Sequence, residues 1–157
     1  MTPVPDDNIA LARSILQLTP YIGRIWALAA RETGTLSVDR LKTLGNLSRL
    51  APVRAGEFAE VCHLSPAAVT HAVDALVEDG FVRREPDPAD RRVVILHVTP
   101  KGRHELERAE RIALAKLARA LDQLEPTTRV QLRDALPKLE GVLARREGED
   151  RKVPQAR

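Results

Sequence analysis

The stretch from Glu57 to Thr99 constrains the fold most, because helical periodicity changes to strand periodicity at a single glycine. From Val69 to Val77, apolar residues recur at the spacing typical of one buried helix face. After Gly80 this spacing is lost, and Val93–Val98 is a mostly β-branched run, which favours a strand. A short helix, a turn, a longer helix and two strands are therefore expected in this order.

Helix-capping residues predict the ends of the longer helix. Ser65 is a good N-cap, and Pro66 stands where a helix needs no backbone donor. Gly80 supplies the left-handed residue that commonly follows a helix. The face opposite the apolar one carries mostly small or polar residues, namely Ala67, Ala68, Thr70, His71, Asp74 and Ala75. Small residues near the start would let the helix lie deep in a major groove, which is about 12 Å wide.

A hairpin with arginines at its tip is expected after this helix. Phe81–Glu85 is a short strand candidate, a Pro/Asp cluster favours a turn, and Val93–Val98 returns. The far end of the hairpin reads Asp90, Arg91, Arg92. A guanidinium on such a tip suits a narrow minor groove, and Asp90 is placed to fix the direction of Arg92 by a charge-assisted bond. The order of elements predicts a winged helix-turn-helix, a device that reads double-stranded DNA.

The same segment closely resembles the MarR family of winged-helix regulators. The family's usual run is ELAExLGLSPSTVTRLVDRLExxGLVxR, followed by DxRR and LTxxG, and this chain has EFAEVCHLSPAAVTHAVDALVEDGFVRR, DRR and VTPKG. The resemblance covers Glu57 to Gly102 and extends more weakly to the helices on both sides. It implies a homodimer that binds a near-palindromic operator, usually as a repressor, and that is often released by a small, frequently phenolic ligand.

Three residues depart from the family pattern. His63 stands where the family has glycine in the turn, and histidine tolerates a left-handed backbone less well. His71 replaces a common arginine, and Arg54 replaces a common threonine, which removes an N-cap. We expect Arg54 to recover phosphate affinity, while His71 either reads a base or phosphate or is a solvated surface histidine. The candidate DNA-binding residues are Arg54, Ser65, Ala67, Ala68, Thr70, His71, Arg84, Asp90, Arg91 and Arg92.

The flanking segments are predicted to be helical. A first helix over Ile9–Arg31 is expected to kink or split at Pro20, a second covers Ser37–Ala51, and a third runs from Pro100 to about Leu124. A last apolar stripe follows from Leu132 to Leu143, with a bend at Pro137. In a dimer of the family's kind these helices would meet between chains; the alternative is packing within one chain.

The expected fold is mainly α with a small β-wing. We divide the chain into an N-terminal helical dimerisation segment (1–36), a winged helix-turn-helix domain (37–99), C-terminal dimerisation helices (100–146) and a flexible tail (147–157). The length of 157 residues fits one ordinary domain with its own dimerisation helices.

Composition narrows the function classes. Aromatic residues make up only 3% of the chain, which argues against binding single strands by base stacking. The net charge is +3, yet residues 51–104 hold seven Lys/Arg and eight Asp/Glu, so phosphate contacts must come from placement. No apolar run approaches the roughly 20 residues of a membrane span, and the N-terminus lacks a signal pattern, so we expect a cytoplasmic protein.

Other chemistries find little support in the sequence. Cys62 takes a position that is normally leucine, so a packed thiol is favoured over a redox sensor, and the scattered histidines predict no metal site. No phosphate loop, nucleophile elbow or paired-carboxylate signature appears, so we expect no enzyme activity and no cofactor. Tyr21, Arg24 and Trp26 are candidates for a small aromatic or apolar ligand, or ordinary core and interface residues. The rival functions are a constitutive DNA-binding protein without a sensor and a winged-helix protein-interaction module.

Overall fold

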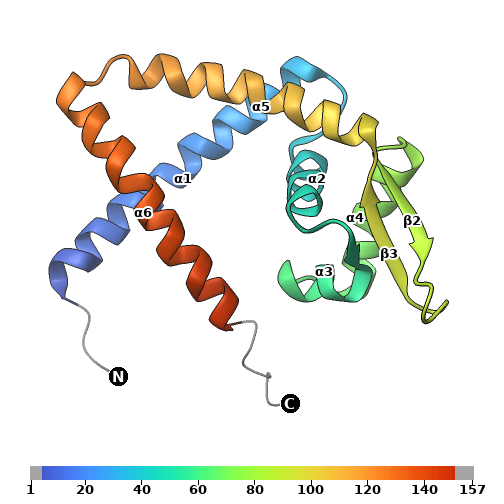
Figure 1. Cartoon of the computed structure of the whole chain (residues 1–157). Helices are drawn as coiled ribbons and strands as arrows, with labels where there is room; N and C mark the ends of the chain where they lie inside the picture. Colours follow the sequence, from blue (N-terminus) through green and yellow to red (C-terminus); the bar gives the residue numbers. More distant parts are fainter. Residues whose placement is uncertain (1–4, 151–157) are drawn as a thin grey trace. The chain divides into compact units, whose positions relative to one another are not determined.

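The computed structural model describes residues 5–150, and their side chains up to residue 146 (Figure 1). The elements in chain order are α1 (Asp6–Thr33), α2 (Val38–Leu50), β1 (Val53–Arg54), α3 (Ala55–Val61), α4 (Pro66–Glu78), β2 (Val82–Pro86), β3 (Val94–Val98), α5 (Pro100–Leu121) and α6 (Pro126–Asp150). The chain divides into two compact units, with the boundary after Lys116 inside α5. The expected mainly α fold with a small β-wing is confirmed.

The sheet has three antiparallel strands in the order β1-β3-β2. Strands β2 and β3 are the expected hairpin, paired from Val82 opposite Val98 to Pro86 opposite Val94. The sequence analysis missed β1, which pairs Val53 with Leu96 on the other edge of β3. This third strand joins the start of α3 directly to the hairpin.

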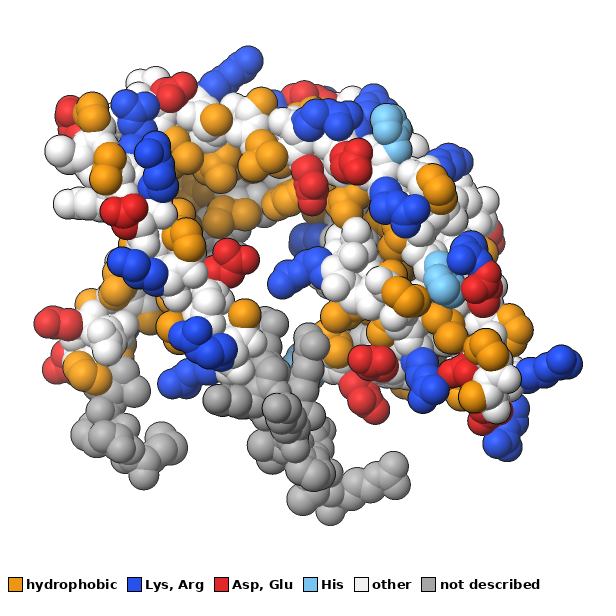
Figure 2. Space-filling view, in the orientation of Figure 1, with side chains coloured by type: hydrophobic (Ala, Val, Ile, Leu, Met, Phe, Trp, Pro, Cys, Tyr) orange, Lys and Arg blue, Asp and Glu red, His pale blue; other side chains and the backbone are white. Residues whose placement is uncertain are grey.

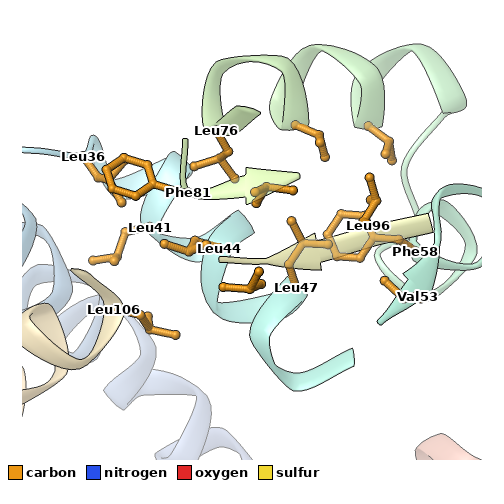
Figure 3. Close-up of a cluster of buried hydrophobic side chains, with 14 of the residues drawn as sticks. Leu36, Leu41, Leu44, Leu47, Val53, Phe58, Leu76, Phe81, Leu96 and Leu106 are labelled. Carbon is orange, nitrogen blue, oxygen red and sulfur yellow. The ribbon is translucent and has the colours of Figure 1, made fainter. Parts of the chain in front are cut away.

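One apolar core holds the first unit together (Figure 3). Leu44 and Leu47 of α2 are fully buried among Leu76 from α4, Phe81 from the start of the hairpin and Leu96 of β3. The core thus fixes the two helices of the helix-turn-helix and the hairpin against a common support. Its fully buried side chains are aliphatic apart from the two phenylalanines, as the composition indicates.

Side-chain caps set several helix ends where the sequence predicts them. The Ser65 hydroxyl accepts from the Ala68 N–H at 3.2 Å, and Ser37 does the same for Arg40 at 3.4 Å. Gly80 has a φ of +75°, in the left-handed region, one residue after the C-cap of α4. These positions confirm the predicted boundaries of α2 and α4.

Pro20 does not split the first helix, because α1 runs unbroken from Asp6 to Thr33, so that part of the expectation is wrong, while a kink at Pro20 stays a prediction. Proline removes one backbone donor, which would have served the carbonyl of Leu16. Leu16 is exposed, so water can satisfy that carbonyl. Pro137 likewise lies inside a continuous α6.

The second unit consists of the end of α5 and the whole of α6. Arg129 on α6 pairs with Asp122 at 3.3 Å, just after the end of α5. The last helix extends to Asp150, so residues 147–150 of the expected tail have helical backbone. The remainder of that tail, 151–157, lies outside the described residues.

Candidate nucleic-acid interface

The turn between α3 and α4 contains the strained residue that the sequence indicates. His63 has a φ of +51°, and its N–H donates to the carbonyl of Glu60 at 3.1 Å. The next amide, of Leu64, donates to the carbonyl of Ala59 at 2.9 Å. Cys62 is half-buried against the core, and its sulfur lies 3.9 Å from the side-chain nitrogen of Asn46. The helix-turn-helix therefore places a side chain where glycine would be free of strain.

Helix α4 presents an exposed surface of small and polar residues beside its N-terminus. The exposed candidates on it are Ser65, Ala67, Ala68, Thr70 and His71. The hydroxyls of Ser65 and Thr70 already make bonds to the helix backbone, Thr70 donating to the carbonyl of Pro66 at 3.0 Å. The imidazole of His71 projects from the same exposed surface. The methyl groups of the two alanines leave the backbone open to close approach.

Arg84 joins the hairpin to α4. Its Nη1 lies 2.5 Å from the Asp74 carboxylate, and its Nη2 donates to the carbonyl of Thr70 at 3.5 Å. Strand β2 is thereby attached to the exposed side of α4 near its middle. Arg84, a candidate DNA contact by sequence, sits at the junction of the two parts of the interface.

The tip of the hairpin confirms the predicted pairing of Asp90 with Arg92. Arg92 Nε lies 3.1 Å from Asp90 Oδ1, and Nη2 lies 3.3 Å from Oδ2. The Arg92 N–H also donates to Asp90 Oδ1 at 3.0 Å. Hydrogen bonds from the Arg92 side chain and then from its backbone lower the pKa of Asp90. The carboxylate is thus ionised at neutral pH and holds the guanidinium by two nitrogens.

The Arg92 side chain remains 91% exposed despite this pairing. Arg91 beside it is exposed too, and basic side chains protrude at the far end of the hairpin, at the lower right of Figure 2. The loop is closed by two backbone bonds, from Asp87 N–H to the carbonyl of Val93 and from Val93 N–H to the carbonyl of Asp90, both 2.8 Å. A cation is therefore held outward on an ordered loop.

The start of the hairpin loop, directly after β2, holds an ion pair that sequence reasoning missed. Arg54 Nε and Nη2 lie 3.1 and 2.8 Å from Asp87 Oδ2. The other carboxylate oxygen accepts from the Ala89 N–H at 2.8 Å, and this bond is the main cause that lowers the pKa of Asp87. Arg54 occupies the N-cap position of α3 but makes no side-chain bond to the start of the helix, as expected for an arginine in place of a threonine.

Two basic residues at the start of α5 bind the protein's own backbone. Lys101 Nζ donates to the carbonyl of Asp79 at 2.6 Å, and Arg103 Nη1 donates to the carbonyl of Val98 at 2.7 Å. Thr99 adds a third bond, since its hydroxyl donates to the carbonyl of Gly80 at 2.8 Å and accepts from the Gly102 N–H at 3.1 Å. Lys101 and Thr99 fasten α5 to the end of α4, whereas Arg103 bonds to the end of β3. The run VTPKG was the available signal for the joint.

The three candidate ligand residues on α1 do not share one environment. The Arg24 guanidinium lies over the Tyr21 ring, 5.8 Å from its centre, and Tyr21 is 62% exposed. Trp26 is half-buried and packs against the core of the first unit. The structure brings Tyr21 and Arg24 together and assigns Trp26 a packing contact.

Two further findings concern the described residues alone. Within 5–150, the histidine, cysteine and carboxylate side chains that are described form no group of three or more suited to a metal ion. In that part of the chain, no helix combines the length and the apolar character that crossing a membrane requires.

Comparison with known proteins identifies the family. Residues 36–94 match the MarR family model. The chain is 42% identical over 99 residues to the uncharacterised HTH-type regulator YcgE of Bacillus subtilis, covering 60% of this chain and 64% of that protein. It is 30% identical over 100 residues to the uncharacterised HTH-type regulator ML2140 of Mycobacterium leprae, covering 64% and 70%. For three of the Bacillus relatives, the match spans 64%, 42% and 51% of their length.

A solved structure supports the fold. The crystal structure of apo MarR from E. coli matches with a TM-score of 0.73 at 22% identity, over 88% of this chain and 98% of that one. At this identity the likeness shows the fold alone. From the sequence match over residues 36–94, the regulator relatives and the shared fold, the chain belongs to the MarR family of helix-turn-helix transcriptional regulators.

Proposed function

We propose that the protein is a sequence-specific, double-stranded DNA-binding transcriptional regulator that acts as a homodimeric repressor. The observation that carries the proposal is the tip of the hairpin, where Asp90 holds an almost fully exposed Arg92 outward. An ion pair at such exposure adds little to stability. A fixed, exposed cation suits the negative potential of a narrow minor groove.

The two parts of the interface would read different grooves. The start of α4, with Ala67 and Ala68 exposed, would enter the major groove, while Thr70 and His71 approach base edges or phosphates. Arg91 and Arg92 would reach the adjacent minor groove. The bond from Arg84 to Asp74 supports this division, because it keeps the hairpin at a fixed position on α4. One rigid body would thus present both contacts together.

Exposed apolar side chains support the dimer. Helix α1 and the second unit leave large apolar residues in water, namely Ile9, Leu11, Ile15, Leu16, Leu18, Tyr21, Ile22, Leu117, Leu121, Val130, Leu136, Val142 and Leu143. Such a quantity of exposed apolar surface marks an interaction site rather than a free monomer. We infer that segments 1–36 and 100–146 join two copies, with recognition helices about one DNA turn, roughly 34 Å, apart. Sedimentation equilibrium that gives a monomer at micromolar concentration would contradict this.

The regulatory part of the proposal concerns a ligand. A small aromatic or apolar anion would bind near Tyr21 and Arg24, where a ring and a cation already lie together, with Trp26 close to the core. Its binding would shift the spacing between the two recognition helices and release the operator. Equal DNA affinity across a broad panel of such compounds would count against a sensor. The protein would work in the cytoplasm, without catalysis or a cofactor.

Substitution of Arg92 tests the DNA-binding role. On a duplex that the protein selects from a random pool, we expect Arg92→Ala to weaken binding about tenfold, the usual size of one lost specific contact. Arg129→Ala is the control for the loss of one arginine and one ion pair, taken from the second unit, and sedimentation equilibrium verifies that it keeps the oligomeric state of the wild type. Circular dichroism and urea unfolding verify that both variants fold. Equal affinity of Arg92→Ala and the wild type would exclude reading by this arginine.

A further inference from the structure

The guanidinium of Arg54 is engaged by a buried carboxylate. Both of its nitrogens that face Asp87 lie within 3.1 Å of the same oxygen, and the Asp87 side chain is only 8% exposed. Arg54 itself is 61% exposed, so its remaining donors face water. A buried carboxylate requires such partners, because desolvation penalises an ionised group that lacks them. The pair is thus a structural bond of the hairpin.

Asp87 organises the loop that carries the arginine tip. Its free carboxylate oxygen accepts the Ala89 N–H, and its own N–H donates to the carbonyl of Val93 across the loop. It therefore bonds both to Ala89 within the loop and to Val93, the residue that precedes β3. Any motion of Asp87 would be transmitted to Asp90 and Arg92, which follow within five residues.

The bond between Arg54 and Asp87 connects the two outer strands of the sheet. Arg54 belongs to β1, on one edge of β3, and pairs with Ile95 of β3. Asp87 directly follows β2, which lies on the other edge of β3. The side chain therefore spans the end of the middle strand. Arg54 is also the residue that precedes α3, so the bond links the first helix of the helix-turn-helix to the loop.

We infer that Arg54 is a positioning residue for DNA binding, which acts through Asp87 by bracing the hairpin loop against α3. In this role it sets where Arg92 stands relative to α4, rather than contacting a phosphate itself. The inference deepens the proposed function and rests on it for its effect on DNA. The sequence-based expectation of a phosphate contact is the competing explanation.

The Asp87→Asn variant separates the two explanations. A phosphate-binding Arg54 would gain from this substitution, because the competing carboxylate is gone and the site becomes more positive. A bracing Arg54 loses its partner, so we expect Asp87→Asn and Arg54→Ala each to weaken binding about five- to tenfold, the range of coupled neighbours. The double variant should bind no more weakly than Arg54→Ala alone. Arg129→Ala, with an ion pair in the second unit, is the charge-matched control once sedimentation equilibrium shows that it keeps the oligomeric state of the wild type.

Salt dependence gives a second readout on the same selected duplex. Loss of a phosphate contact lowers the slope of log affinity against log salt by about 0.9. If Arg54 is a brace, Arg54→Ala lowers the affinity while the slope changes by less than about 0.9. Wild-type-like or tighter binding of Asp87→Asn, together with a slope reduced by about 0.9 in Arg54→Ala, would overturn the inference.

Hydrogen exchange tests the brace without DNA. In Arg54→Ala and in Asp87→Asn, the amides of Asp87, Ala89 and Val93 should exchange about tenfold faster, while those in α4 stay as protected as in the wild type. Unchanged exchange of the loop amides in Arg54→Ala overturns the inference even if the wild type selects no DNA. If the wild type selects no DNA but the loop amides exchange faster in both variants, the proposed function alone is refuted.

Discussion

Replacement of Gly102 by alanine is the sharpest test of how α5 is joined to the winged helix. A Cβ at this position would lie 2.3 Å from the Phe81 carbonyl oxygen and 3.1 Å from Val98 Cγ1. The oxygen belongs to the backbone and accepts the Thr99 N–H at 3.0 Å, so it cannot turn away as a side chain would. The helix and the start of the hairpin must instead separate by about 1 Å to reach the 3.4 Å of ordinary contact.

The expected cost follows from that displacement. Overpacking of a buried site costs about 1–3 kcal/mol, and weakening the bond from Thr99 to Phe81 adds about 1 kcal/mol. Alanine's better helix propensity returns at most about 1 kcal/mol. We therefore expect Gly102→Ala to lower the free energy of unfolding by about 1–3 kcal/mol.

Gly45 provides the matched control within the same unit. It lies inside α2, and a Cβ there would meet only Leu106 Cδ1, at an ordinary 3.9 Å. Gly45→Ala should therefore raise the free energy of unfolding by about 0.5–1 kcal/mol through helix propensity. Urea unfolding at one fixed protein concentration measures both, since dimerisation makes stability depend on concentration. A Gly102→Ala protein as stable as Gly45→Ala would refute the close contact between α5 and Phe81.

Two further substitutions probe strain and protonation. His63 is held at a φ of +51°, and His63→Gly should raise the free energy of unfolding by about 0.5 kcal/mol or more. The reason is that relief of the left-handed backbone outweighs the added freedom of the unfolded chain. His63→Ala should bring no gain, and an equal urea midpoint for the wild type and the glycine variant would show that no strain is stored. Burial and then the charge of Arg83 lower the pKa of His97 below its ordinary 6.5. A Glu85 oxygen lies 3.0 Å from Nε2, but without hydrogen-bond geometry. Because the folded protein favours neutral imidazole, the contribution of His97 to stability is fully present above pH 6.5 and is lost as the pH drops below that value. His97→Gln should therefore lose less of its urea midpoint between pH 7.5 and about 5.5 than the wild type does. An identical loss in both proteins would contradict the assignment.

Local signals account for most of what the sequence predicted. The ends of α4 follow from Ser65 and Gly80, which act through bonds and backbone freedom within a few residues. The pairing of Asp90 with Arg92 is local in the same sense, since the two residues lie in one tight loop. Such features need no knowledge of the tertiary fold.

The features that sequence reasoning missed depend on distant parts of the chain. Strand β1 has only two residues, too few for any periodicity, and it exists because β3 lies beside it. The bond between Arg54 and Asp87 joins residues 33 apart and requires the strand order β1-β3-β2. Continuity of α1 through Pro20 likewise depends on exposure of the preceding turn to water, which the helical pattern alone does not specify.

Selection of bound duplexes from a random pool, with purified protein at near-physiological salt, tests the central claim most directly. The account predicts an enriched near-palindrome with half-sites about ten base pairs apart, each flanked by a position sensitive to Arg92→Ala. A folded dimer that enriches no motif would contradict sequence-specific reading by α4 and the hairpin.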